Sequence, residues 1–382
     1  MIYLDNAATT KIDDRVLCAM TPYLKEQYGN PGALYSLGRE SKRAVDKARE
    51  QVAELINCDP EQIVFTSGGS EANNLAIKGF LEDGDGVVIS RTEHDSVWNA
   101  ADGFRYAFGA ATPFVNGTVG IGAIDSLLNE YSQLVSVMYV NNETGAINPV
   151  KRIAERCHEH KLYFHTDCVQ ALGAVPVDVR DIGCDFASFS SHKIHGPKGV
   201  GALFVKNRDL LTPLVFGGKE QEFGLRGGTE NVAGIVGFGE ACRITRENLS
   251  SNIEYVTKLR DTFLEELTAC IKQLGIPDET MHINGNIRMC SPKVLSLRFE
   301  GVDAQSLVLM MDANGVCISA GSACHSHENR PSRTLLAMML SPDQARSSVR
   351  VSFSVDNTVD EVKDAARILA NCVLTLAYNN FD

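Results

Sequence analysis

The sequence has no long apolar run. No stretch reaches the roughly 18 consecutive apolar residues of a membrane-spanning helix. The first residues, Met1 to Asp5, also lack the basic segment followed by an apolar one that marks a secretory signal. We therefore expect a cytoplasmic protein with no membrane partner.

Positive charge is scarce as well. The chain has 36 Lys and Arg residues against 48 Asp and Glu residues, a formal net charge of −12. Domains that bind nucleic acid usually carry an excess of basic residues, so this composition argues against a nucleic-acid partner. Small anionic ligands must then be held by local groups rather than by the overall charge of the protein.

Closely spaced cysteine pairs are also missing. The eleven cysteines are scattered, and no Cys-x-x-Cys motif occurs. Disulfide frameworks and zinc sites use closer and more regular spacing, so we expect neither a disulfide scaffold nor a metal site. Most of the cysteines should be small buried apolar residues in a reducing compartment.

The 382 residues, 44% of them hydrophobic, suffice for roughly two domains. Short apolar segments alternate with segments of helical period up to about residue 205, which predicts an α/β fold with a mainly parallel central sheet flanked by helices. After a helical stretch at 231–267 the pattern changes to alternating strands and helices, typical of a smaller α+β domain. We place the boundary near residues 249–252.

Lys193 is the first candidate for chemistry. It follows the apolar run 184–189 and precedes a Gly-Pro turn and a second apolar run, 200–205. This places the lysine at the carboxyl end of a strand, where open α/β sheets bind ligands. A partly buried lysine can have a lowered pKa and attack a carbonyl as the free amine, whereas most lysines are solvated surface charges. Both interpretations remain open from this segment alone.

A second candidate is the turn Ser67-Gly68-Gly69-Ser70, which joins a predicted strand, 62–66, to a predicted helix, 71–81. Backbone amides at a helix N-terminus suit a phosphate group, and Ser70 adds a hydroxyl. A plain strand-to-helix turn has a similar sequence.

Polar residues follow three further predicted strands. His94 follows the strand at 87–90, Asn141 and Asn142 follow the strand at 134–140, and Asp167 follows the strand at 162–165. A carboxylate and a lysine on one crevice are what pyridoxal phosphate requires, because the lysine bonds with the aldehyde and the carboxylate keeps the pyridine nitrogen protonated. A histidine at a strand end is often structural, so His94 alone decides nothing.

Cys324 differs from the other cysteines because it lies in a polar segment, 320–331, beside His325 and near Arg330. In such surroundings a thiol can have a lowered pKa and act as a nucleophile. An incidental surface thiol and a metal site with His327 are the alternatives. The nearby ligand candidates are too local for a closed tetrahedral metal site.

Together these motifs resemble the cysteine desulfurases of the NifS/IscS type, class V members of the fold-type I pyridoxal-phosphate enzymes. The resemblance covers nearly the whole chain, and it rests on eight segments in a fixed order: 3–10, 29–31, 65–71, 92–94, 141–145, 165–170, 191–193 and 321–324. It implies a large cofactor-binding domain at 15–250 and a small domain, 1–14 with 251–382, that carries the cysteine.

The resemblance also implies roles toward the cofactor, pyridoxal 5'-phosphate. Lys193 would form the Schiff base and move protons at the substrate, Asp167 would pair with the pyridine nitrogen, and the catalytic His94 would stack on the ring. Gln170 and Asn142 would bond the phenolic oxygen. The phosphate would be held by Gly69, Ser70, Ser190 and His192, together with Thr229 of the partner subunit in a homodimer.

For the substrate, the resemblance assigns L-cysteine, with Asn142 and Arg350 in its binding site and Arg350 on its carboxylate. Strand alternation alone would place Arg350 on an outward face. Cys324 would attack the sulfur, which leaves L-alanine and a persulfide on Cys324. The spacing from Cys324 to Ser332 resembles the subgroup that delivers sulfur to an iron–sulfur scaffold or another acceptor protein.

Three positions depart from the family pattern: Tyr35 stands where a histidine is usual, Cys168 where an alanine is usual, and the loop at Gly217-Gly218 is one residue longer. A related lyase or aminotransferase, for example one acting on selenocysteine, would need the same cofactor residues but not Cys324. A non-catalytic scaffold would need none of them.

Overall fold

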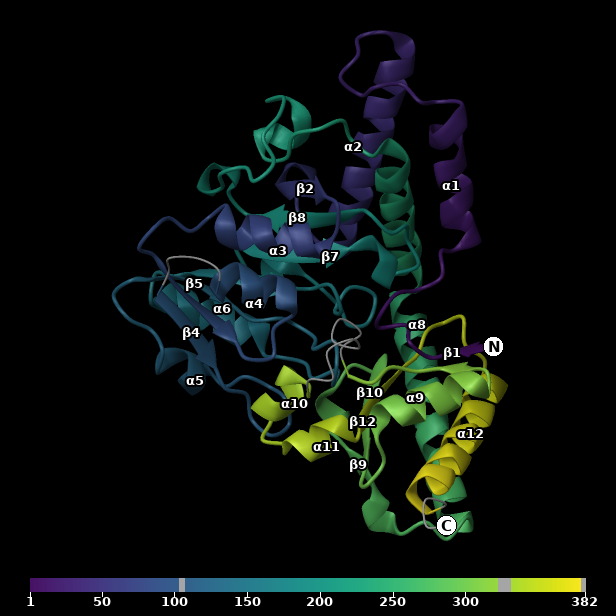
Figure 1. Ribbon diagram of the computed structural model, residues 1–382. Helices are drawn as coiled ribbons and strands as arrows, with labels where there is room; N and C mark the ends of the chain where they lie inside the picture. Colours follow the sequence, from purple (N-terminus) through teal and green to yellow (C-terminus); the bar gives the residue numbers. More distant parts are fainter. Residues whose placement is uncertain (103–106, 322–330, 379–382) are drawn as a thin grey trace.

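The computed structural model describes residues 1–102, 107–321 and 331–378. This portion of the chain forms a larger part built on one wide sheet and a smaller part with two small sheets (Figure 1). The long helix α8 (Val232–Gln273) runs through both.

The central sheet has seven strands within the described residues, in the order β2-β8-β7-β6-β5-β3-β4. Strand β8 is antiparallel to β2 and β7, and the other neighbours are parallel. The strands are β2 (Ile63–Thr66), β3 (Gly86–Ser90), β4 (Ala107–Ala111), β5 (Ser132–Ser136), β6 (Tyr163–Asp167), β7 (Phe186–Ser190) and β8 (Gly201–Val205). The predicted mainly parallel α/β sheet is confirmed.

Helices cover both faces of this sheet. Successive side chains of a strand point to opposite faces, and in β3 Val88 joins one core cluster while Val87 and Ile89 join another. The first cluster contains α2 (Ser36–Ile56), α6 (Val150–Glu159) and the start of α8; the second contains α3 (Gly69–Lys78) and α4 (Asp95–Asp102). The sheet is thus shielded on both sides, which explains its continuous apolar strands.

Three further helices complete the larger part: α1 (Asp14–Lys25), α5 (Ile121–Asp125) and α7 (Val179–Ile182). One prediction here needs correction, because the strand expected at 134–140 ends at Ser136. The chain continues irregularly, and Val140 forms an isolated antiparallel bridge with Ile147 instead. Asn141 and Thr144, which follow this segment, are buried.

The smaller part is of the predicted α+β type. Strands β9 (Met281–Ile283), β10 (Val294–Phe299) and β12 (Ser348–Ser352) form an antiparallel sheet, and β1 (Ile2–Tyr3) pairs in parallel with β11 (Val316–Cys317). Its helices are α9 (Ala304–Ala313), α10 (Arg333–Ala337), α11 (Pro342–Arg346) and α12 (Val359–Tyr378). The N-terminal Leu4 is buried in the same core as Phe263 and Phe353.

Helix α8 joins the two cores without a break. Its residues up to Ile244 pack in the larger part, and those from Val256 onward pack in the smaller part. The change from one core to the other falls between Ile244 and Val256 within the helix, and no loop marks it. In the described residues, no helix is both long and apolar enough to cross a membrane.

Candidate active site

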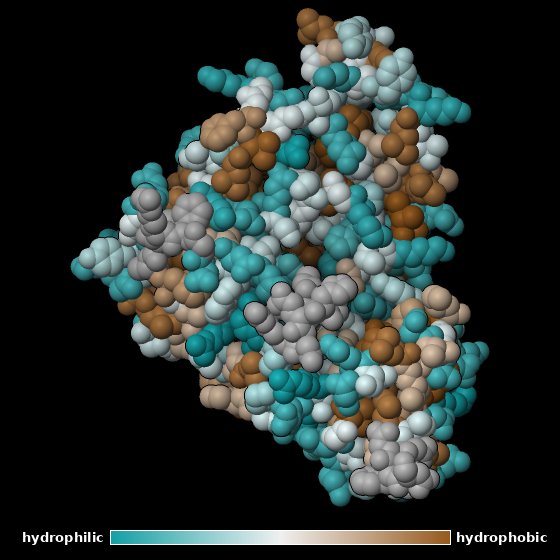
Figure 2. Space-filling model, viewed as in Figure 1, coloured by the Kyte–Doolittle hydropathy of each residue, from teal (hydrophilic) through white to brown (hydrophobic). Residues whose placement is uncertain are grey.

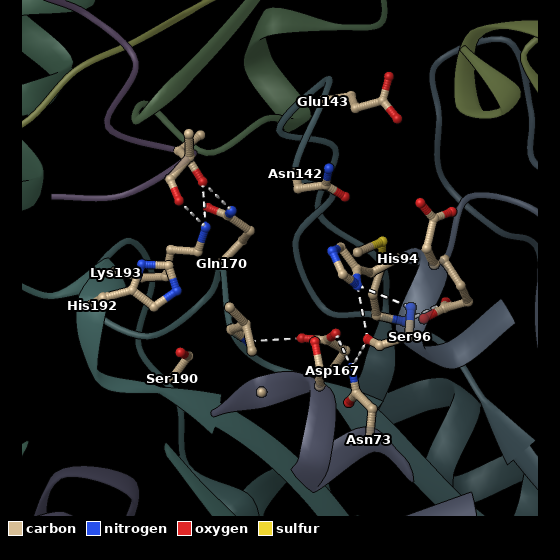
Figure 3. A pocket seen from close by; sticks show the side chains of 18 of the residues that line it. Asn73, His94, Ser96, Asn142, Glu143, Asp167, Gln170, Ser190, His192 and Lys193 are labelled. Atoms are coloured by element: carbon tan, nitrogen blue, oxygen red, sulfur yellow. Dashed lines mark hydrogen bonds between the residues drawn. The ribbon is translucent and has the colours of Figure 1, made fainter. Parts of the chain in front are cut away.

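A cavity of about 320 Å³ lies at the carboxyl ends of the parallel strands (Figure 3). Residues that follow β3, β5, β6 and β7 line it, and Arg350 of β12 lines it from the smaller part. Parallel strands end at one edge of a sheet, so residues distant in sequence meet there. The surface is hollowed between the two parts of the molecule, with largely hydrophilic residues around the hollow (Figure 2).

Lys193 lies in a short turn directly after β7. Its Nζ donates hydrogen bonds to the backbone carbonyl oxygens of Ala7 and Ala8, at 2.6 and 2.8 Å (Figure 3). Burial, reinforced by the positive charges of Lys293 and Arg350, lowers the pKa of Lys193 to about 7. The neutral, nucleophilic amine is therefore far more accessible at neutral pH than in an ordinary solvated lysine.

Asp167 is the last residue of β6 and is 4% exposed. Its Oδ2 accepts a hydrogen bond from Asn73 Nδ2 at 2.7 Å, and its Oδ1 accepts one from the backbone amide of Val169 at 2.9 Å. These donors fix the carboxylate without neutralising its charge. In the described part of the chain Asp167 has no ion-pair partner, so a cationic ligand atom beside it would be stabilised.

His94 is oriented through the same hydrogen-bond network. The backbone amide of Ser96 donates to His94 Nδ1 at 3.1 Å, and the Ser96 hydroxyl lies 2.8 Å from the same atom. An amide can only donate, so Nδ1 is an acceptor and the neutral ring carries its proton on Nε2. Asn73 Nδ2 donates to both the Ser96 hydroxyl, at 2.9 Å, and Asp167. One asparagine thus links the supports of both groups.

The cavity continues past the start of α3 into a second space of about 420 Å³, which Gly69, Ser70 and Ser190 also line. Gly69 opens the helix, so its end presents free backbone amides. A Cβ at Gly69 would lie 2.6 Å from a methyl carbon of Val169, so only glycine fits here.

His192 lies between the two spaces. Its Nδ1 is 3.1 Å from the Thr9 hydroxyl. Burial, followed by the positive charges of Lys193 and Lys198, lowers the pKa of His192 to about 4. The ring is therefore neutral at neutral pH, and it contributes hydrogen bonding rather than charge.

Gln170 and Arg350 both line the cavity. Gln170 Nε2 donates to the Ala7 carbonyl at 2.9 Å. Arg350 Nη1 donates to the Asn142 carbonyl at 2.8 Å, and its Nη2 lies 2.7 Å from Asp5 Oδ1. Strand alternation would have turned Arg350 outward, yet it is only 2% exposed because the N-terminal segment covers it. A buried guanidinium suits a carboxylate ligand.

These residues fit the predicted cofactor. Gln170 Oε1 and Asn73 Oδ1 are buried without a hydrogen-bond partner in the described structure, so both have capacity for a polar ligand. An amine of lowered pKa, a carboxylate without an ion pair and a helix N-terminus line connected spaces. Pyridoxal phosphate carries the complementary groups: an aldehyde, a pyridine nitrogen and a phosphate.

Most of the predicted site residues meet in this cavity: Gly69, Ser70, His94, Asn142, Asp167, Gln170, Ser190, His192, Lys193 and Arg350. Thr229 is exposed and lines neither space within its own chain. Cys324 lies outside the described residues. The chemical roles assigned to all of these residues stay predictions.

The residues on either side of the segment that contains Cys324 lie at the cavity rim. The Ser332 hydroxyl donates to Glu143 Oε2, and a Cβ at Gly321 would lie 3.7 Å from the same oxygen. Arg333 lies over the Trp98 ring at 4.3 Å and pairs with Asp95 at 3.0 Å. None of the ten cysteines in the described residues lines the cavity.

Sequence reasoning missed several residues that support the site. Asn73 and Ser96 orient other side chains, Asp5 pairs with Arg350, and Lys293 donates to the Lys193 carbonyl at 2.6 Å. Partners far apart in sequence leave no local pattern, so these supporting contacts could not be predicted. In the described residues, no group of three or more metal-ligating side chains is placed to hold a metal ion.

The chain belongs to the class-V aminotransferase family, whose sequence profile matches residues 2–364. Enzymes of this family depend on pyridoxal phosphate, so the cofactor that fits the cavity is also the cofactor of the family.

Individual relatives agree with this assignment. The chain is 37% identical over 381 residues to a protein named cysteine desulfurase IscS from Clostridium botulinum strain Hall, covering 97% of this chain and 94% of the relative. A solved NifS-like protein superposes with a TM-score of 0.88 at 31% identity, covering 98% and 100% of the two chains. A structure described as SspA in complex with cysteine has a TM-score of 0.80 at 31% identity, covering 93% and 99%. The predicted fold type I is confirmed.

Proposed function

We propose that this chain is a pyridoxal-phosphate-dependent cysteine desulfurase that converts L-cysteine to L-alanine and places the sulfur on Cys324. One observation carries the proposal: Lys193, Asp167 and Arg350 line one cavity, and both flanks of the Cys324 segment lie at its rim. Relatives named cysteine desulfurase and a similar structure with cysteine in its title support the substrate.

The bound cofactor supplies an aldehyde for an amine and a ring that accepts electrons. Lys193 would provide the amine that bonds with the aldehyde, and the same amine would move protons at the substrate carbons. Asp167 would hold the proton of the pyridine nitrogen, and His94 would stack on the ring. The side-chain amides of Gln170 and Asn142 would donate hydrogen bonds to the phenolic oxygen.

The N-terminus of α3 would hold the phosphate of the cofactor. Gly69 and Ser70 offer amides and a hydroxyl there, and Ser190 and His192 close the site from the end of β7. Thr229 of the partner subunit would complete this phosphate site in a homodimer. Thr229 is exposed and lines neither cavity of its own chain, which agrees with such a role.

Arg350 binds the substrate carboxylate, with Asn142 beside it. The Cys324 thiolate attacks the sulfur of L-cysteine, so that an S–S bond forms and the C–S bond breaks. The substrate carbon takes up a proton from Lys193 and leaves as L-alanine. The Cys324 thiol and L-cysteine are thereby converted to the Cys324 persulfide and L-alanine, with no other reactant consumed.

Beyond the reaction, the persulfide on Cys324 would pass its sulfur to an iron–sulfur scaffold or another acceptor protein.

The proposed domains are a large one at 15–250 and a small one formed by 1–14 and 251–382. The separate cores that meet within α8 support this division. A cytoplasmic location agrees with the ten described cysteines, which are all free thiols, as expected in a reducing compartment.

The test is the release of alanine and sulfide from L-cysteine in the presence of a thiol reductant. Wild type should release both in equal amounts. Cys324→Ser should still change the absorption of the bound cofactor on adding cysteine, but its rate should fall by about 100-fold or more because the nucleophile is absent. Cys18→Ser, at an exposed cysteine of α1, is the matched control and should act like wild type.

Full alanine and sulfide release by Cys324→Ser would contradict the role of this cysteine. A wild-type protein that acts on selenocysteine but not on cysteine would favour the related lyase instead.

A further inference from the structure

A second buried lysine, Lys293, contacts the backbone of Lys193. Lys293 precedes β10 and is only 9% exposed. Its Nζ donates a hydrogen bond to the backbone carbonyl oxygen of Lys193 at 2.6 Å. In the described part of the chain no carboxylate forms an ion pair with it, although buried charges are usually paired. Within the described structure, Lys293 therefore carries a buried positive charge whose role is not the formation of an ion pair.

The two lysines also line one small cavity of about 50 Å³. His195 lines the same space, and its Nδ1 lies 3.3 Å from Asp356. His192, whose pKa burial and the nearby lysines lower to about 4, is neutral at neutral pH. The positive charge of Lys293 is thus close to Lys193 and is not cancelled locally.

The electrostatic consequence follows from the signs of the charges. Burial lowers the pKa of Lys293 to about 8, so it remains mostly protonated at neutral pH. Its charge is the largest single cause, after burial, that lowers the pKa of Lys193 to about 7; Arg350 acts in the same direction, and Asp5 and Asp167 oppose both. Two like charges so close disfavour the second proton.

We propose that Lys293 is a positioning residue for Lys193: it holds the Lys193 carbonyl in place and supplies a buried positive charge that keeps the Lys193 amine neutral and nucleophilic. The proposal rests on the proposed function, in which Lys193 is the amine that bonds with the cofactor. It assigns Lys293 no contact with cofactor or substrate.

The test measures the reactivity of the Lys193 amine directly. The full-length chain, freed of cofactor, is labelled with trace acetic anhydride between pH 5 and 11, and the Lys193 peptide is quantified by mass spectrometry. Wild type should show a midpoint near pH 7. In Lys293→Met the midpoint should rise by about one pH unit or more, because the variant removes a like charge that disfavours the proton on Lys193.

Two further variants separate charge from packing. Lys293→Arg keeps the charge and should keep the wild-type midpoint. Lys293→Gln keeps a hydrogen-bond donor for the Lys193 carbonyl but no charge, so its labelling midpoint should rise as in Lys293→Met. If the methionine variant does not fold, the glutamine variant alone tests the effect of the charge. An unchanged midpoint in folded Lys293→Gln, an equal rise in Lys293→Arg, or a wild-type midpoint near 10.5 would each overturn the proposal.

The labelling uses neither substrate nor cofactor. Its outcome is therefore independent of whether the chain releases alanine and sulfide from cysteine, and failure of the proposed function would be recognised separately.

Discussion

The loop that carries Thr229 is fastened to the sheet by one buried ion pair. Arg49 of α2 and Glu222 of the loop are 8% and 5% exposed, and they meet in two parallel contacts of 2.7 and 2.9 Å. Glu222 Oε2 also accepts a hydrogen bond from the backbone amide of Phe65 at 2.7 Å. The Arg49 guanidinium lies between two aromatic rings, 4.7 Å from Phe65 and 5.0 Å from Phe223.

This anchor holds the loop in a strained conformation. Glu222 and Phe223 have φ angles of 42° and 59°, in the left-handed region. Each such residue costs roughly 1–2 kcal/mol when it is not glycine. The ion pair and the aromatic contacts must offset that cost, so the loop should lose its shape when the carboxylate is removed.

Glu222→Ala leaves a buried guanidinium without its anion and the Phe65 amide without its acceptor. Breaking one partner of a buried pair typically costs about 3–5 kcal/mol. The entropy of unfolding of a chain of 382 residues is about 0.8 kcal/mol/K, so a loss of about 4 kcal/mol lowers the melting temperature by about 5 °C. The affinity for cofactor should fall as well, because Thr229 lies at the end of the loop.

The assay is urea unfolding of the cofactor-free chain, with the single variants Glu222→Ala and Arg49→Met and the double variant. Because both singles break the same pair, the double variant should cost about 1–3 kcal/mol less than the sum of the two. Lys151→Met removes an exposed pair with Asp181 and is the control, with an expected loss below about 1 kcal/mol. Strict additivity of the two singles, or a Glu222→Ala loss as small as that of the control, would refute the reasoning.

Two further predictions concern the cavity. Arg350→Lys keeps the positive charge beside Asp5 but loses the two-pronged guanidinium, so KM for L-cysteine should rise by about 10-fold or more while kcat changes less; an unchanged KM in steady-state kinetics would exclude a carboxylate contact. Between pH 7 and 10.5 the unfolded chain binds the Lys193 proton and the folded chain does not, so stability rises with pH in this window. The Lys193→Met variant lacks that rise. Below pH 7 its free energy of unfolding, measured with urea, should exceed that of the cofactor-free wild type by a few kcal/mol, and this excess should vanish near pH 10.5. A pH-independent difference in the free energy of unfolding would rule out the lowered pKa of Lys193.

Local patterns were sufficient for the strands and for the residues at their ends. The apolar runs before His94, Asp167 and Lys193 predict buried parallel strands, and parallel strands bring their carboxyl ends to one edge. The structure places all three side chains on one cavity. The strand at 134–140 was predicted too long, because apolar character alone does not show where a chain leaves the sheet.

Support from distant residues could not be predicted. Strand alternation predicts that Arg350 points outward, but its ion pair with Asp5 and its hydrogen bond to the Asn142 carbonyl hold it as a buried cation. In the same way, the backbone carbonyls of Ala7 and Ala8 accept hydrogen bonds from Lys193, which lies more than 180 residues away in the sequence. Such contacts depend on how the smaller part folds back over the larger one.

The sequence by itself determined the α/β class, the family and the set of residues that follow the strands, because periodicity and motif order are local properties of the chain. Tertiary structure alone decided which charges lie near the Lys193 amine and hence how readily it loses its proton. That property depends on burial and on the positions of Lys293 and Arg350, which reach Lys193 only after the two cores have packed together.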